Sequence, residues 1–237
     1  MGLLSRFFAR RSVQPLSISY GITVCHEAQE LRRLLTALLT AIDVEDEIIV
    51  LRDVTHAAPE VSRVLEEFSD RVRVIEARLD NDFATFKNRL FAAAEGDYLF
   101  QIDADEVPSA SLLAHLKPYL RRHPRCDCFR VPRLNTVHGI TEKQIAQWGW
   151  KMDANGHINF PDRQPRIARN NGKVRWKNKV HEIFTGYTAL KKMPARDYTY
   201  CILHVKTLHR QEQQNDMYDT IVAQTNDRAR QPAIDES

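Results

Sequence analysis

The first hundred residues of the chain alternate short apolar runs with longer segments in which apolar residues recur at helical spacing. Apolar side chains at every third or fourth position indicate amphipathic helices, and short β-branched runs between them indicate buried strands. The expected strands are residues 16–25, 47–51, 72–75 and 98–102, and the expected helices are residues 26–40, 60–68 and 83–94. This order predicts an α/β fold with an open, mostly parallel central sheet and helices on both faces.

The pattern changes after Pro108, although a length of 237 residues suits a single domain. We expect helices at 110–122 and 207–224, strands at 126–131, 164–168, 173–176 and 198–204, and an irregular segment at 135–160. The predicted organisation is therefore one domain with two halves, flanked by tails. The halves are residues 16–107 and 108–225, and the tails are residues 1–15 and 226–237.

Composition narrows the class of protein. A hydrophobic fraction of 43% and a charged fraction of 27% are ordinary for a soluble globular chain. A net charge of +3 is too small to indicate nucleic-acid binding by itself. No apolar run approaches the roughly 20 residues that span a bilayer, and the four cysteines fit no common disulfide or zinc pattern. We expect a cytoplasmic protein whose short basic and apolar N-terminus, residues 1–11, is not a signal peptide and could touch a membrane surface peripherally.

The strongest chemical signal follows the fourth expected strand, where the sequence is Asp103-Ala104-Asp105-Glu106. Ligands of open parallel sheets bind outside the carboxyl ends of the strands. Two carboxylates there can approach one cation, and hard oxygen ligands suit Mg²⁺ or Mn²⁺. Such a cation neutralises a diphosphate leaving group. The alternative is a solvated acidic turn that caps the following helix.

Three more clusters offer candidate chemistry. His181 beside Glu182 provides a metal ligand or a general base, or is simply a charged strand end. His204 could complete a metal shell and Lys206 could meet phosphate, whereas a structural histidine is an equally good interpretation. Asp162 is an alternative base or a turn residue.

The tryptophans of the irregular segment form a further candidate group. Trp148 and Trp150 could stack on a sugar or a base, and core packing explains them equally well.

Together these residues resemble the family 2 glycosyltransferases, which have the Rossmann-like GT-A fold. The Asp46-Glu47-Ile48-Ile49-Val50 run fits a strand of that family, Lys87-Asn88 fits a pair that precedes the metal strand, and Asp103 and Asp105 fall on its metal and diphosphate motif. His26-Glu27 replaces a usual Asn-Glu, and of a usual pair of acids only Asp53 is kept. The resemblance covers residues 17–222.

The later motifs resemble one branch of the family, small bacterial transferases that add sugars to surface polysaccharide cores. These motifs are residues 166–170, Val180-His181-Glu182 and His204-Val205-Lys206.

The resemblance implies a nucleotide-sugar-binding first half and a smaller catalytic, acceptor-binding second half. It implies transfer of a sugar, with inversion, from a nucleotide-diphosphate donor, with a UDP-sugar favoured, to a hydroxyl acceptor. The implied donor-binding residues are His26, Glu27, Asp53, Lys87, Asn88, Asp103, Ala104 and Asp105. The implied ligands of Mn²⁺ or Mg²⁺ are Asp103, Asp105, His181 and His204. The implied base is Glu182, with Asp162 as the alternative, and the acceptor side is assigned to Trp148, Trp150 and Arg166.

The acceptor is the least constrained part of this interpretation. A lipopolysaccharide or other surface glycan or glycolipid is the first choice, approached from the inner face of the membrane. A protein side chain or a modified DNA base is the alternative, since the basic residues between 173 and 192 could guide a polyanion. Nucleotidyl transfer is disfavoured because residues 24–28 contain no glycine-rich phosphate loop. Non-catalytic carbohydrate binding is the remaining alternative, and it would not require the paired carboxylates.

Overall fold

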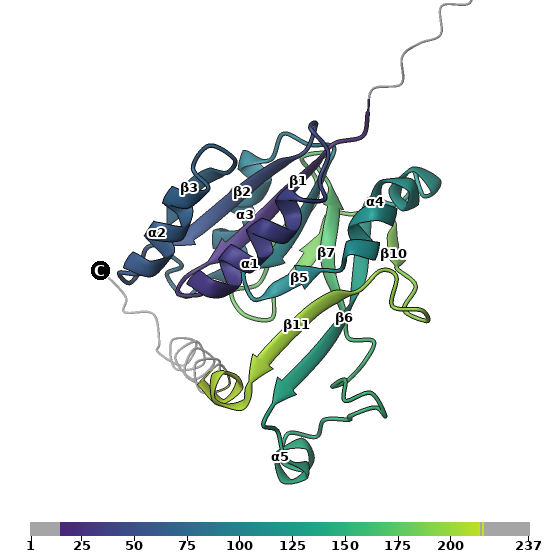
Figure 1. Cartoon of the computed structure of the whole chain (residues 1–237). Coiled ribbons are helices and arrows are strands. Elements are labelled where there is room, and N and C mark those ends of the chain that lie inside the picture. The colour runs from purple at the N-terminus through teal and green to yellow at the C-terminus, as the bar shows by residue number, and fades with distance from the viewer. Residues whose placement is uncertain (1–14, 214, 216–237) are drawn as a thin grey trace, which may run out of the picture.

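A curled mixed sheet forms the centre of the molecule in the computed structural model, which describes residues 15–213 and 215 (Figure 1). The strand order is β3-β2-β1-β4-β7-β6-β11-β5, with β10 paired to β6 beside this path. The strands are β1 (Ile18–Val24), β2 (Glu47–Asp53), β3 (Arg73–Ala77), β4 (Tyr98–Asp103), β5 (Glu106–Pro108), β6 (Cys128–His138), β7 (Arg163–Arg169), β8 (Arg175–Lys177), β9 (Ile183–Thr185), β10 (Leu190–Lys192) and β11 (Ile202–Thr207). The helices are α1 (Ala28–Leu39), α2 (Pro59–Glu67), α3 (Phe83–Ala93), α4 (Ala110–Arg122) and α5 (Glu142–Gln147).

The first four strands are parallel, as the alternating pattern predicts. β1 pairs with both β2 and β4, and β2 pairs with β3. The register places Thr23 of β1 opposite Asp103 of β4, so the ends of these two strands meet at one edge of the sheet. The predicted strands and helices of the first half are confirmed.

Helices cover both faces of this parallel part. The leucine stripe of α1 and the apolar faces of α2 and α4 pack on one face, in the largest buried cluster. Helix α3 covers the other face through Phe86 and Leu90, which pack against Ile49, Leu51 and Leu99. Because helices cover both faces, β1 and β4 have almost no exposed position and are mostly apolar.

The second half extends the sheet with strands of both directions. β7 is antiparallel to β4 and to β6, and β11 runs parallel to β6 and antiparallel to β5. β8 and β9 form a separate two-stranded hairpin that packs on α3. In Figure 1 the ends of β6 and β11 reach away from the parallel part, β6 toward α5 and β11 toward the helical residues 208–213.

Several elements of this half differ from the sequence expectation. β6 continues to His138, well past the expected end at residue 131, and β9 and β10 were not expected. Helix α5 lies in the segment expected to be irregular; it begins with a capping box of Thr141 and Gln144 and buries no side chain, so it has no apolar stripe. Residues 208–213 are helical, and the rest of the helix expected at 207–224 lies, apart from residue 215, outside the described residues.

No helix within the described part of the chain is long and apolar enough to cross a bilayer. The N-terminal segment expected to touch a membrane, residues 1–11, lies outside the described residues.

Candidate active site

A large cavity opens at the carboxyl ends of β1, β2 and β4. Its volume is about 1140 Å³, enough for a nucleotide sugar and part of an acceptor. Residues from both halves of the chain line it, including Asp53 and Asp103 from the first half and Trp150, Glu182 and His204 from the second. The cavity therefore lies where sheets of this type bind their ligands.

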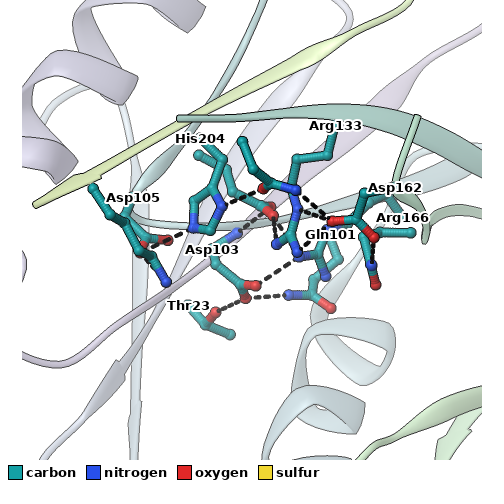
Figure 2. Close-up of polar contacts among 12 residues, drawn as sticks. Thr23, Gln101, Asp103, Asp105, Arg133, Asp162, Arg166 and His204 are labelled. Carbon is teal, nitrogen blue, oxygen red and sulfur yellow. Dashed lines mark hydrogen bonds and ion pairs between the residues drawn. The ribbon is translucent and has the colours of Figure 1, made fainter. Parts of the chain in front are cut away.

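Asp103 ends β4 at the floor of this cavity, and both of its carboxylate oxygens are engaged (Figure 2). Oδ1 accepts hydrogen bonds from the Thr23 hydroxyl at 2.9 Å and from the Gln101 amide at 3.0 Å. Oδ2 accepts one from Arg166 at 2.7 Å. Burial raises the pKa of Asp103, but the Arg166 and Lys87 cations and the Thr23 hydroxyl hold it well below its ordinary value. The carboxylate is therefore ionised and fixed in one orientation.

Beneath Asp103 lies an ion network that the sequence did not reveal. Glu106 is fully buried and accepts hydrogen bonds from Arg166 at 2.6 Å and from Arg133 at 2.9 Å. Its second oxygen accepts the backbone N–H of Asp103 at 3.2 Å. Arg133 continues the network to Asp162 at 2.7 Å. Acids and arginines thus alternate from Asp103 to Asp162, and each guanidinium is held between two carboxylates (Figure 2).

Asp105 lies beside a second group of polar side chains. Its Oδ2 is 3.4 Å from His204 Nε2, 3.5 Å from Lys206 Nζ and 3.6 Å from Arg210. Burial raises the pKa of the Asp105 carboxyl, but His204 and Lys206 lower it to well below its ordinary value. Burial lowers the pKa of His204 in spite of the neighbouring carboxylate, so its ring is neutral near pH 7.

The proton of the neutral His204 ring can be placed from its other neighbour. The Asn135 Nδ2 donates to Asp162 at 2.7 Å, which turns the Asn135 Oδ1 toward His204 Nδ1 at 2.7 Å. An oxygen acceptor there requires the proton to be on Nδ1. Nε2 faces the Asp105 carboxylate at 3.4 Å, so these two groups could share a cation.

This arrangement is a test of whether the residues fit a divalent metal. Magnesium in nucleotide sites takes one or two protein ligands and completes its shell with phosphates and water. Asp105 supplies one such carboxylate, and His204 adds an imidazole nitrogen whose other ring nitrogen lies 2.7 Å from an amide oxygen, as in many metal sites. No group of three His, Cys, Asp or Glu side chains within residues 15–213 and 215 could hold a metal by itself. The assignment of Asp103 and His181 as further ligands stays a prediction.

Lys87 connects Asp103 to the predicted base. It is buried in α3, 3.6 Å from Asp103 Oδ1, and its ammonium group also donates to Glu182. Its Nζ lies 5.2 Å from the centroid of the Trp176 ring. Burial lowers the pKa of Lys87, but Asp103 and Glu182 raise it to above its ordinary value, so the cation persists.

The two candidate bases have different surroundings. Glu182 lines the cavity from the turn between β8 and β9, and the Lys87 ammonium contacts its Oε1. Asp162 also lines the cavity, but Arg133 and Asn135 donate to its Oδ2 and Gln164 donates to its Oδ1. Burial raises the pKa of Asp162, and Arg133 and these hydrogen bonds together bring it below its ordinary value.

The predicted donor residues of the first half line the opposite wall. Asp53 is buried at the end of β2, and its Oδ1 accepts the N–H groups of Thr55 at 2.9 Å and Leu79 at 3.2 Å. Glu27 accepts the N–H of His26 at 3.0 Å and a hydrogen bond from Arg210 at 3.1 Å. Both acids thus hold the loops that form the wall.

Four other predicted residues lie in the wall of the cavity or behind it. Asn88 is not among the lining residues, because its side chain pairs with the backbone of Trp176 at 2.9 and 3.0 Å. Trp150 lines the cavity, and the Trp148 ring packs 4.8 Å from it, centroid to centroid. Ala104 is buried between the two aspartates and lines the cavity.

The comparisons with known proteins agree with this geometry. The family model for glycosyl transferase family 2 matches residues 19–199, and the chain belongs to that family. No curated protein matches the chain. Among solved structures, S. aureus TarS 1–349 in complex with UDP-GlcNAc is similar, with 13% identity and a TM-score of 0.55 over 81% of this chain and 59% of that one.

Two further TarS structures are similar in the same way. The complex of TarS 1–349 with UDP also has 13% identity and a TM-score of 0.55, over 80% of this chain and 60% of that one. A longer TarS chain has 11% identity and a TM-score of 0.52 over 80% of this chain and 37% of that one. At these identities the likeness shows the shared fold, and the chain spans about 59% of the first of these relatives. The predicted family and the GT-A fold are confirmed.

Proposed function

We propose that this protein transfers a sugar from a UDP-sugar to a hydroxyl group of a surface glycan, with inversion and with a divalent metal. Membership of glycosyl transferase family 2 supports the reaction class. The complexes of TarS with UDP-GlcNAc and with UDP, on the same fold, favour a UDP-sugar as donor. The observation that carries the metal is the approach of His204 Nε2 to Asp105 Oδ2, 3.4 Å apart in the cavity.

The metal, Mn²⁺ or Mg²⁺, would be held by Asp105 and His204 and would supply positive charge to the departing diphosphate. Lys206 adds a fixed cation within 3.5 Å of Asp105. Thr23 and Arg166 hold Asp103 in a position where it would accept hydrogen bonds from hydroxyl groups of the donor. These side chains are already positioned by their contacts with one another, so they need not reorganise when charge develops on the leaving group.

Glu182 is the base in this proposal. It takes the proton of the acceptor hydroxyl as that oxygen bonds to the anomeric carbon and the bond from this carbon to the diphosphate breaks. Asp162 is the poorer base, because four hydrogen bonds occupy its oxygens and its pKa is lowered. A base needs a free lone pair and a pKa close to the working pH.

The test is a titration of UDP and UDP-GlcNAc with and without Mn²⁺, in wild type and in Asp105→Asn. We expect metal-dependent binding in wild type and its loss in the variant. Glu182→Gln should bind UDP like wild type and lose transfer by about 100-fold or more. Metal-independent binding that Asp105→Asn leaves unchanged would overturn the metal site, and full transfer by Glu182→Gln would remove it as the base.

A further inference from the structure

The hairpin of β8 and β9 has two faces of opposite character. Trp176 and Phe184 point inward and pack with residues of α3 and the sheet. Every second residue from 173 to 179 is a cation with an exposed side chain: Lys173, Arg175, Lys177 and Lys179. Arg175 and Lys177 lie on one face of β8, where alternate residues are about 7 Å apart, whereas Lys173 precedes the strand and Lys179 lies in the turn after it, so the four cations succeed one another in a row along this segment. We refer to this row as the basic hairpin.

The basic hairpin has no compensating charge in the described part of the chain. None of its four cations lies within 4 Å of a carboxylate there. The nearby acids are committed elsewhere: Asp82 caps α3 by accepting the N–H of Thr85, and Asp80 lies 3.6 Å from Arg78. Glu182, in the same hairpin, pairs with Lys87. The outer face therefore has a positive potential.

The hairpin is held at both of its ends and leads to the cavity. Gly186 closes it at a positive φ of 78°, where a Cβ would lie 2.1 Å from the carbonyl oxygen of Lys173. The turn after β8 is anchored because the Phe83 N–H donates to the carbonyl of Lys179 at 3.0 Å. Glu182, which follows this turn, lines the cavity. The row of cations thus ends within a few residues of the proposed base.

We propose that the basic hairpin binds an acceptor glycan that carries anionic groups, such as phosphate or carboxylate, and guides its hydroxyl to Glu182. This inference rests on the proposed glycosyl transfer and names the chemical class of its acceptor. Lysine side chains on a flexible stem suit successive anions of a polymer whose spacing varies. A row of cations that leads to a catalytic cavity raises the local concentration of such an acceptor and orients it.

The test measures binding of a fluorescein-labelled heparin hexasaccharide to the full chain by fluorescence anisotropy, with neutral maltohexaose as the uncharged probe. The variant is Lys177→Gln/Lys179→Gln. The matched control is Arg121→Gln/Arg122→Gln, which removes two exposed charges at the end of α4, among residues that do not line the cavity. We expect the hairpin variant to bind the hexasaccharide about tenfold more weakly, the control within about twofold of wild type, and added salt to weaken wild type most.

Three results would overturn the proposal. One is equal weakening in the two double variants, which would make the effect one of net charge. Another is no preference of wild type for the charged over the neutral hexasaccharide. A third is hairpin-dependent binding to phosphatidylglycerol vesicles without hexasaccharide binding, which would assign the surface to a membrane. UDP binding is measured in the same proteins: its absence from wild type would refute the proposed function and leave the glycan result intact.

Discussion

Replacement of Glu106 by glutamine tests whether the buried ion network holds the two halves of the site together. Glu106 is fully buried and accepts hydrogen bonds from two arginines, at 2.6 and 2.9 Å, and from the backbone of Asp103. Glu106→Gln keeps the shape but removes the charge that balances Arg133 and Arg166. Breaking a buried ion pair on one side costs about 3–5 kcal/mol. For a domain of this size that corresponds to a decrease of roughly 6–20 °C in Tm.

The assay is urea unfolding followed by circular dichroism, together with thermal unfolding. The matched control is Glu95→Gln, where an exposed carboxylate lies 3.5 Å from Arg73 and we expect no measurable change. UDP binding should also weaken in Glu106→Gln, because Asp103 loses the partner that fixes its backbone. A loss of less than about 1 kcal/mol for Glu106→Gln would refute the reasoning, since exposed pairs already reach that value.

Three further predictions follow from the same contacts. Asp162 has a lowered pKa in the folded protein, so its contribution to stability is present above its ordinary pKa near 3.9 and is lost as the pH falls through the lower, folded value. Wild type should therefore lose more stability than Asp162→Asn between pH 5 and pH 3, measured by the midpoints of urea unfolding. Equal losses in the two proteins would contradict this prediction. Asn135→Ala should weaken Mn²⁺-dependent UDP binding by roughly 10- to 100-fold in calorimetry, because His204 loses the acceptor that orients its ring. The control Asn155→Ala, at an exposed position, should bind UDP like wild type. Equal UDP affinities of Asn135→Ala and wild type would refute the tautomer assignment. Burial raises the pKa of the thiols of Cys128 and Cys201 to about 12 and 11. Both side chains are fully buried, so they should react with a thiol reagent at pH 8 only after unfolding, and their rapid reaction in the folded protein would contradict the packing.

The parallel half of the fold could be predicted because its local patterns and its tertiary environment agree. The strands of this half are short, mostly apolar runs, and each helix has one apolar stripe, so periodicity separates them. Asp103 and Asp105 were found by the same logic, since they directly follow the last of these strands. The second half gave weaker signals: β6 turns polar after Val131 and α5 buries nothing, so neither pattern has a clear period.

The site residues that were not predicted from the sequence were missed for a different reason. Arg133 and Asn135 lie about 30 residues from Asp103 and Asp105 in sequence, and only the pairing of β6 with β7 and β11 brings them to the cavity. One signal was visible: Gln101 is a polar residue inside an otherwise apolar strand, and such a residue usually has a buried partner, here Asp103. Glu106 directly follows the aspartate motif, but sequence alone does not show that it is fully buried.

Asp103 and Asp105 have different surroundings, which favours different roles for the two acids: positioning the donor for Asp103 and binding the cation for Asp105. Asp103 already accepts hydrogen bonds from Thr23, Gln101 and Arg166, so one lone pair is left to position a donor and little capacity remains for a cation. The proposed cation is assigned to Asp105, because this carboxylate lies 3.4 Å from His204 Nε2. A substitution at Asp103 should therefore affect stability and donor orientation together, whereas His204→Gln should affect metal dependence first. If the two aspartates instead acted as one metal-binding unit, Asp103→Asn and Asp105→Asn would change the Mn²⁺ affinity equally.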